Sequence, residues 1–315
     1  MHNTTLCIEH ATFTTMQIGY IGLGKMGKNM VLRLLEKGHD IVAWNRSKEP
    51  GIEVATQGAT VVENVNDIIL KLKSPRTIWL MLPAGDVTQQ MINQLLPHLE
   101  KGDTIIDGAN SNFNDTIKRA KQITGQGIHF MDIGVSGGPG GSRTGACLMI
   151  GGKQHDYNRY IPLFKDIAAP NAYQFFNGHG AGHFVKMIHN GIEYGMMQAI
   201  GEGFEIMKQS NFNLDLEQVA RIYNQRSVIE SRLVGWLYSG YRKHGQDLEP
   251  ISGSIKHSGE GEWTLQTARQ MNIPAPVIDA AFQFRLDSDQ NPSYTGKVVS
   301  VLRNEFGGHD VKKES

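Results

Sequence analysis

Residues 17–27 read Gln17-Ile18-Gly19-Tyr20-Ile21-Gly22-Leu23-Gly24-Lys25-Met26-Gly27, and this stretch decides the fold. A short apolar run typical of a buried strand leads into three glycines spaced GxGxxG, and an amphipathic segment over 26–37 predicts a helix after them. In such a unit the glycines permit a tight turn, a close approach of the backbone to a pyrophosphate and close packing of helix on strand. The positive end of the helix then faces the phosphates. We therefore predict a dinucleotide site, with a turn that serves packing alone as the alternative; its residues are Gly22, Leu23, Gly24, Lys25, Met26 and Gly27.

The same rhythm of strand and helix continues to residue 178. Short apolar runs recur, with longer amphipathic stretches between them, at 18–21, 41–44, 77–82, 104–107 and 129–135. This pattern predicts a parallel sheet. After residue 180 these runs stop and helix follows helix, with breaks near 211–213, 239–245 and 272–276. We therefore expect an α/β chain in three parts: a disordered extension over 1–15, a Rossmann-type doubly wound parallel sheet over 16–179, and an all-helical substrate-binding and dimerisation domain over 180–315.

The overall charge is balanced, with 31 lysines and arginines against 31 aspartates and glutamates in 315 residues. Since no long-range field attracts such a chain to nucleic acid or to an anionic membrane, a small-molecule partner fits better. The first 15 residues lack the pattern of a signal peptide, and no run of about 18 apolar residues predicts a membrane span. Cys7 and Cys147 lie too far apart in sequence to suggest a disulfide framework or a cysteine zinc site. We therefore expect a cytoplasmic protein without a bound metal.

The end of the second predicted strand bears on the choice of dinucleotide. An NAD site usually presents a carboxylate about 20 residues beyond the glycines, whereas here the strand runs into Asn45-Arg46-Ser47. A guanidinium and a hydroxyl at this point suit a 2′-phosphate, because arginine binds phosphate through charge-assisted, bidentate hydrogen bonds. The prediction is NADP, with NAD possible. The alternatives are that Arg46 is an ordinary solvated loop residue and that the site accepts both cofactors.

A polar stripe marks the segment that follows residue 180. If residues 182–197 are helical, Lys186, His189, Asn190 and Glu193 fall at i, i+3, i+4 and i+7 on one face of an otherwise apolar helix. Because an unpaired buried charge is costly, this stripe must face a partner, a cavity or a ligand; an internal Lys186–Glu193 pair or a solvated face is the alternative. Gly191 and Gly195 each weaken a helix by about 1 kcal/mol, which suggests that something approaches its backbone closely.

Motifs in both halves resemble one enzyme family. Lys186 and Asn190 resemble the catalytic pair of the β-hydroxyacid dehydrogenase superfamily, and residues 189–195 (HNGIEYG) resemble the signature of its 6-phosphogluconate dehydrogenase branch. Further matches are Asp107-Gly108-Ala109-Asn110-Ser111, Val135-Ser136-Gly137-Gly138 and Arg303-Asn304-Glu305-Phe306-Gly307-Gly308-His309. The resemblance spans residues 17–309 and is to the short, decarboxylating form of the family.

This resemblance implies oxidative decarboxylation of 6-phosphogluconate to ribulose 5-phosphate, as in the pentose phosphate pathway and gluconate metabolism. It implies Lys186 as the base, Glu193 as the acid and Asn190 as the residue that orients them. The sugar acid would contact Asn110, which also faces the cofactor, together with Ser136, Gly137, Gly138, His189, Asn190 and Tyr194. Its phosphate would be held by Arg285, and by Arg303 and His309 of the neighbouring subunit of a homodimer.

Simple physical arguments favour these roles. A base must be a neutral amine, and partial burial in an apolar helix lowers the pKa of a lysine such as Lys186. Burial of Glu193 keeps its proton available for donation. Arg285, Arg303 and His309 supply cationic donors for a phosphate, and the turn Phe306-Gly307-Gly308 fixes the approach of His309.

The chain also departs from the family pattern. Ser258-Gly259-Glu260-Gly261-Glu262-Trp263 replaces a KGTGKW-like loop of the long members, which puts phosphate contacts from that loop in doubt; Lys256 is a possible substitute. Glu230-Ser231-Arg232 stands where an arginine is expected first. The second helical half of the long enzymes is missing, so the dimer contacts must be arranged differently or be smaller.

Two other functions remain open. Another β-hydroxyacid dehydrogenase, such as a 3-hydroxyisobutyrate dehydrogenase, would share Lys186 and Asn190 but would have no use for Glu193 as an acid or for the FGGH tail. A non-catalytic dinucleotide sensor would keep the glycine turn and lose the helix stripe, which is present here.

Overall fold

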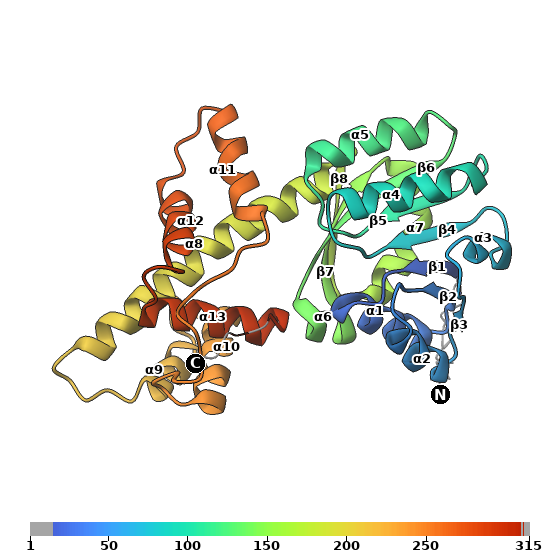
Figure 1. Cartoon of the computed structure of the whole chain (residues 1–315). Coiled ribbons are helices and arrows are strands. Elements are labelled where there is room, and N and C mark those ends of the chain that lie inside the picture. Colours follow the sequence, from blue (N-terminus) through green and yellow to red (C-terminus); the bar gives the residue numbers. More distant parts are fainter. Residues whose placement is uncertain (1–14, 310, 312–315) are drawn as a thin grey trace, which may run out of the picture.

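The computed structural model describes residues 15–309 and 311 (Figure 1). One part is a sheet covered by helices, the other is built of helices alone, and the long helix α8 (Ala181–Gln209) runs from the first part through the second. The predicted α/β fold with a helical C-terminal part is therefore confirmed. Most of the expected N-terminal extension, residues 1–14, lies outside the described residues.

The first part contains a single eight-stranded sheet with the strand order β3-β2-β1-β4-β5-β6-β7-β8. Its strands are β1 (Gln17–Ile21), β2 (Asp40–Trp44), β3 (Thr60–Val61), β4 (Thr77–Leu80), β5 (Thr104–Asp107), β6 (His129–Ser136), β7 (Ala146–Gly152) and β8 (Ala168–Asn177). The first six strands are parallel, as the alternation of strand and helix predicts. The β6–β7 pair is antiparallel and β7–β8 is parallel, an extension of the sheet that the sequence pattern does not reveal.

The helices follow the predicted breaks near 211–213 and 272–276, but the break predicted at 239–245 is wrong for residues 239–244, which are helical and include the buried Gly240 and Tyr241. Those of the first part are α1 (Lys25–Glu36), α2 (Glu49–Thr56), α3 (Asp67–Lys71), α4 (Asp86–Leu95), the 3₁₀ turn η1 (Leu96–His98), α5 (Phe113–Thr124), α6 (Gly138–Thr144) and α7 (Gln154–Ile167). After α8 come α9 (Leu216–Tyr223), α10 (Arg232–His244), α11 (Glu260–Gln270), α12 (Pro276–Asp287) and α13 (Tyr294–Gly307). The interruptions after residues 209, 244 and 270 coincide with the polar and proline-containing stretches of the sequence.

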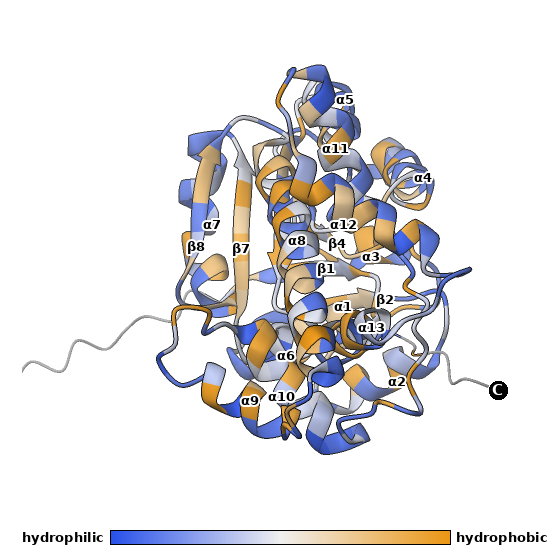
Figure 2. Cartoon of the chain, turned by 90° about the vertical axis from the view of Figure 1, so that its left-hand side faces the viewer, coloured by the Kyte–Doolittle hydropathy of each residue, from blue (hydrophilic) through white to orange (hydrophobic). Residues whose placement is uncertain are grey.

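Each part has its own apolar core. The two faces of the sheet bury separate clusters, one containing the stacked rings of Tyr20 and Trp79 and the other containing Ile78 and Ile105. A third cluster fills the helical part around Leu237, Val298 and neighbouring side chains. Apolar and polar residues alternate along helices such as α4 and α5 (Figure 2), as expected for helices with one buried face. None of the helices in the described residues is long and apolar enough to cross a membrane.

Candidate active site

The glycine turn between β1 and α1 has the geometry that its sequence predicts. Gly22 has a φ of +102°, and a Cβ added there would lie 2.2 Å from the carbonyl oxygen of Met81. A Cβ on Gly27 would lie 2.1 Å from the carbonyl oxygen of Gly22, so both positions require glycine. At Gly24, directly before α1, an added Cβ would meet nothing within 4 Å. The backbone beside the helix N-terminus is therefore open, which fits a bound pyrophosphate.

The loop after β2 supports this turn from the side. The Asn45 side-chain oxygen accepts a hydrogen bond of 2.8 Å from the backbone N–H of Leu23, and its amide nitrogen donates to the backbone oxygen and the hydroxyl of Ser47. Asn45 therefore fixes the turn. Arg46 is exposed and makes no hydrogen bond or ion pair with the described residues, so its guanidinium is available to a ligand.

Helix α8 is anchored to the sheet by a buried carboxylate. Asp132 in β6 is fully buried, and its two oxygens accept hydrogen bonds from the backbone N–H groups of Gly180, at 2.7 Å, and His183, at 2.9 Å. These donors belong to the first turn of the helix, where backbone N–H groups lack partners within the helix. A Cβ on Gly134 in the same strand would lie 2.3 Å from Cβ of Lys186, so glycine there lets the lysine stem pass.

The predicted polar stripe of α8 is a connected network. Lys186 is only 5% exposed, and its Nζ donates to the side-chain oxygen of Asn190 and lies 3.4 Å from Nδ1 of His189. His189 Nδ1 also lies 2.9 Å from the Asn190 oxygen and 3.7 Å from a carboxylate oxygen of Glu193. On its other side, His189 Nε2 lies 3.3 Å from the hydroxyl of Ser136 at the end of β6. The stripe thus joins both parts of the chain.

Burial shifts the protonation of this network toward neutral forms. It lowers the pKa of Lys186, an effect that the nearby carboxylates of Glu193 and Glu260 partly oppose. Burial also raises the pKa of Glu193, partly offset by Lys186 and Arg285. The pKa of His189 is lowered by burial and then by the charge of Lys186. A lysine whose pKa is lowered and a glutamate whose pKa is raised are thereby held two helical turns apart on α8.

The opposite end of the site is cationic. Arg285, 3% exposed, has its guanidinium carbon 3.3 Å from the centroid of the Tyr194 ring, and burial lowers its pKa to about 10. Arg303 lies close enough to Glu193 and Tyr194 to interact with both, and burial lowers its pKa as well. Nη2 of Arg285 and the hydroxyl of Tyr194 are buried without a hydrogen-bond partner. Arg285, with a buried donor that has no partner, and the nearby cation of Arg303 fit an anionic group of a ligand, since buried polar atoms are normally paired.

One cavity of about 870 Å³ collects these groups. Every residue predicted to act in catalysis or to bind substrate lines it: Asn110, Ser136, Gly137, Gly138, Lys186, His189, Asn190, Glu193, Tyr194, Arg285, Arg303 and His309. Met26 of the glycine turn lines it too, so the cavity adjoins the dinucleotide site. Its volume suits a small metabolite beside part of a cofactor.

The cavity also contains residues to which the sequence assigns no role in the site. They are Cys147, Arg232, Trp236, Ser258 and Glu260. Arg232 lies 4.8 Å from the Trp236 ring, and one carboxylate oxygen of Glu260 is buried without a hydrogen-bond partner. The SGEGEW loop, residues 258–263, therefore reaches the cavity, where it presents the carboxylate of Glu260 and not a lysine. Lys256 is exposed and does not line the cavity, so its role as a substitute stays a prediction.

Two predicted site residues, Asn110 and Gly138, are fixed by contacts within the chain. Asn110 has a φ of +52°, and its side-chain amide makes hydrogen bonds with both the N–H and the carbonyl of Val135. Gly138 is required by packing, because a Cβ there would lie 1.7 Å from the carbonyl oxygen of Phe306 in α13. The end of α13 thus packs on the first part of its own chain, and Lys25 of the glycine turn donates to the carbonyl of Gly308.

The C-terminal tail lines the cavity of its own chain. Arg303 and His309 both belong to this lining, and Asn304 fixes the tail by donating a hydrogen bond of 2.7 Å to the carbonyl of His309. The contribution of these residues to a neighbouring subunit stays a prediction.

The glycines inside α8 serve close packing of helices. A Cβ on Gly191 would lie 2.6 Å from a methyl carbon of Thr264 in α11, and one on Gly195 would lie 3.2 Å from Val277 in α12. The close approach suggested by these glycines is therefore made by neighbouring helices.

Comparison with known families covers nearly the whole chain. Residues 17–180 match the NAD-binding domain of 6-phosphogluconate dehydrogenase, and residues 182–311 match the C-terminal domain of the same enzyme. The chain belongs to the 6-phosphogluconate dehydrogenase family. This result confirms the family resemblance of the sequence motifs and makes the first part of the chain an NAD-binding domain.

Two relatives are matched over nearly their whole length. A Bacillus subtilis relative, whose name marks its assignment to 6-phosphogluconate dehydrogenase as provisional, is 43% identical over 95% of this chain and 100% of its own length. The NAD⁺-dependent, decarboxylating 6-phosphogluconate dehydrogenase of Haloferax volcanii is 37% identical over 95% of this chain and 99% of its own length.

A longer family member provides a structural match. The 6-phosphogluconate dehydrogenase of Plasmodium falciparum, studied as apo form and in complexes with NADP⁺ and with 6-phosphogluconate, is 30% identical with a TM-score of 0.76. The match covers 88% of this chain and 65% of the Plasmodium chain, so this chain spans about two thirds of the length of that relative.

Proposed function

We propose that the chain oxidises and decarboxylates 6-phosphogluconate to ribulose 5-phosphate and CO2, with reduction of NADP or NAD. The observation that carries this proposal is the placement of Lys186, Glu193 and the Arg285–Arg303 pair in one cavity beside the glycine turn. A base, an acid and a phosphate-binding pair are the three elements that this reaction requires of the protein.

The dinucleotide would be held by the first part of the chain, residues 16–179 in our division, and the substrate mainly by residues 180–315. The open backbone at Gly24 would receive the pyrophosphate, and Arg46 would bind a 2′-phosphate, so we favour NADP. When bound, the nicotinamide supplies the hydride acceptor. Both dinucleotides occur among the relatives: the Haloferax enzyme is NAD⁺-dependent, and the Plasmodium enzyme was studied with NADP⁺.

Lys186 would act on the C3 hydroxyl of the substrate. Because its pKa is lowered by burial, the neutral amine is accessible and can take the hydroxyl proton as hydride leaves C3. Asn190 holds the amine by accepting its hydrogen bond, which fixes the direction of the lone pair. The resulting ketone lies β to the C1 carboxylate. The C1–C2 bond can therefore break, with its electron pair drawn toward the ketone that the protonated lysine polarises, and CO2 leaves.

Glu193 would complete the reaction. Loss of CO2 leaves an enediol, and a proton must be added to the carbon that becomes C1 of ribulose 5-phosphate. The pKa of Glu193 is raised by burial, so the carboxyl keeps a proton to give. His189 lies between Lys186 and Glu193 and next to Ser136, where it can bind the hydroxyl groups of the sugar acid.

The substrate phosphate would bind Arg285, Arg303 and His309. The unpartnered donors of Arg285 and Tyr194 support this placement. In the structure of the single chain, Arg285, Arg303 and His309 all line the same cavity. A homodimer in which the tail completes the neighbouring site, the cytoplasmic location and the role in the pentose phosphate pathway remain parts of the proposal.

The direct test is a substrate comparison on the purified full-length chain. Incubation with 6-phosphogluconate and NADP should release CO2 and reduced cofactor in equal amounts, while 3-hydroxyisobutyrate should give neither. Turnover of 3-hydroxyisobutyrate without turnover of 6-phosphogluconate would assign the chain to another β-hydroxyacid reaction. Dinucleotide binding without turnover of either compound would favour a sensor.

A further inference from the structure

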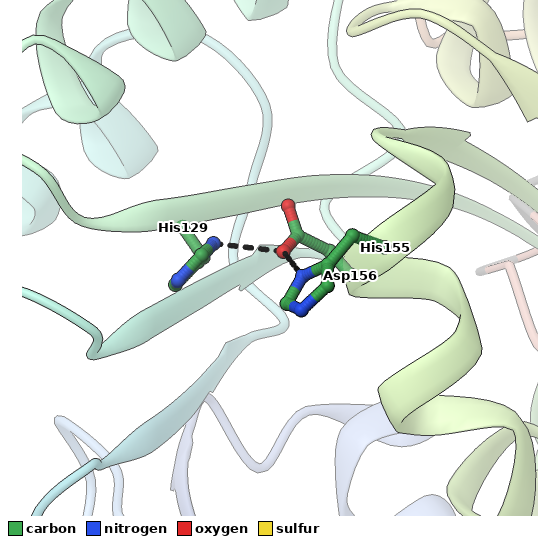
Figure 3. Close-up of side chains that lie close together, drawn as sticks. All are labelled: His129, His155 and Asp156. Carbon is green, nitrogen blue, oxygen red and sulfur yellow. Dashed lines mark hydrogen bonds and ion pairs between the residues drawn. The ribbon is translucent and has the colours of Figure 1, made fainter.

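Two histidines and an aspartate from β6 and α7 form a cluster of side chains (Figure 3). His129 begins strand β6, and His155 and Asp156 lie in the first turn of α7, where that helix packs beside the strand. None of the three lines the cavity of the candidate active site. Within residues 15–309 and 311 this is the one group of three or more such side chains whose potential ligand atoms come close enough together to hold a metal ion.

The geometry of the cluster converges on a single carboxylate oxygen. Nδ1 of His129 lies 2.7 Å and Nδ1 of His155 lies 3.2 Å from the same oxygen of Asp156. All three ligand atoms lie within 4.8 Å of one another. Ligands at about 2.0–2.2 Å around a tetrahedral zinc ion are themselves about 3.3–3.5 Å apart, so modest side-chain rotations would admit an ion between these atoms.

The cluster has a buried carboxylate on one side and solvent-accessible imidazoles on the other, which suits a bound ion. Asp156 is 3% exposed, and a buried carboxylate needs a positive partner. The His155 side chain is 81% exposed and that of His129 is 34% exposed, so the side of the cluster away from Asp156 is open to solvent. Water could complete the coordination there. With neutral imidazoles the three ligands carry one net negative charge, which favours a divalent cation.

We propose that His129, His155 and Asp156 bind a divalent transition-metal ion of the zinc type. Two imidazole nitrogens and one carboxylate oxygen suit zinc, nickel or copper, whereas magnesium and calcium prefer oxygen ligands. The ion would join the start of β6 to the start of α7. Strand β6 continues to Asp132, which anchors α8, so the ion would brace the strand on which the catalytic helix rests. This proposal is independent of the reaction assigned to the cavity.

The test is titration of the metal-free, full-length chain with zinc chloride by calorimetry. The key variant is His155→Ala, because this side chain is 81% exposed and contributes little to the packed core; His129→Ala is the second. The matched control is His98→Ala, an exposed histidine in η1 outside the cluster. His2, Cys7 and His10, which are also residue types that bind zinc, lie outside the described residues. The test therefore rests on the difference in zinc binding between the variants and not on zinc binding by the unmodified chain alone.

We expect the unmodified chain and His98→Ala to share a zinc site whose affinity falls at least about tenfold in His155→Ala and in His129→Ala. Zinc should also raise the thermal unfolding midpoint of the unmodified chain and of the control more than that of the two cluster variants. Equal zinc affinity and an equal midpoint shift in all four proteins would overturn the proposal, as would magnesium binding at this cluster as strongly as zinc.

Discussion

Replacing Lys186 by methionine separates its chemical role from its structural one. Methionine keeps an unbranched stem of similar length beside Gly134 but removes the amine. The Asn190 oxygen that loses the amine still lies 2.9 Å from His189 Nδ1, which donates to it in the Nδ1-protonated tautomer. A near volume-conserving change of this kind alters the free energy of unfolding by less than about 1.5 kcal/mol.

The effect of Lys186→Met on the rate should be much larger. A positioned general base contributes about 10²–10⁴-fold, which corresponds to about 2.7–5.5 kcal/mol of transition-state stabilisation. We therefore expect hydride transfer from 6-phosphogluconate to slow by at least about 100-fold, measured as formation of reduced cofactor in a single turnover.

The matched control is Lys208→Met on the same helix. Lys208 pairs with Asp247 at the surface and does not line the cavity, so its loss should leave the rate unchanged. A rate for Lys186→Met within tenfold of that of the unmodified chain, in protein that is folded by thermal unfolding, would refute the assignment of Lys186 as the base.

The remaining predictions concern the acid, the pH profile, the cofactor and the helix anchor. Glu193→Gln should bind 6-phosphogluconate within a few-fold of the original affinity but form ribulose 5-phosphate at least about 100-fold more slowly; an unchanged rate rejects it as the acid. The rate should fall toward acid pH as Lys186 is protonated, with a midpoint below the ordinary pKa of lysine. It should also fall toward alkaline pH as Glu193 ionises, with a midpoint above the ordinary pKa of glutamate, and this alkaline fall should be absent in Glu193→Gln. Arg46→Ala should raise the KM for NADP at least about tenfold and leave that for NAD unchanged, and equal effects on both would exclude a 2′-phosphate contact. Asp132→Asn places an amide donor against one of two backbone N–H groups and should destabilise the chain by about 2 kcal/mol in denaturant unfolding; no change in stability would mean that the anchor of α8 is unimportant.

The sequence predicts the parts of the site that depend on local spacing. The glycine turn and the α8 stripe are visible because GxGxxG and the positions i, i+3, i+4 and i+7 have direct geometric meaning. The functional roles assigned to these residues rest on the family pattern and await the experiments above.

What the sequence does not predict depends on distant contacts. Asp132 looks like an ordinary strand residue, because its partners Gly180 and His183 lie 48 and 51 positions later. Strand β8 contains a proline and an asparagine with positive φ, so it lacks the apolar alternation of a typical strand. The carboxylate of Glu260 in the cavity likewise becomes visible only once α11 is packed against α8.

Helix α8 carries both groups proposed to transfer protons on a single uninterrupted element. Its 29 residues extend about 43 Å at 1.5 Å per residue, and Lys186 and Glu193 both lie on it. Their separation is therefore set by the rise of one helix and does not depend on the relative orientation of the sheet and the other helices. A rotation of the sheet or of the other helices about α8 would therefore leave the spacing of these two groups unchanged.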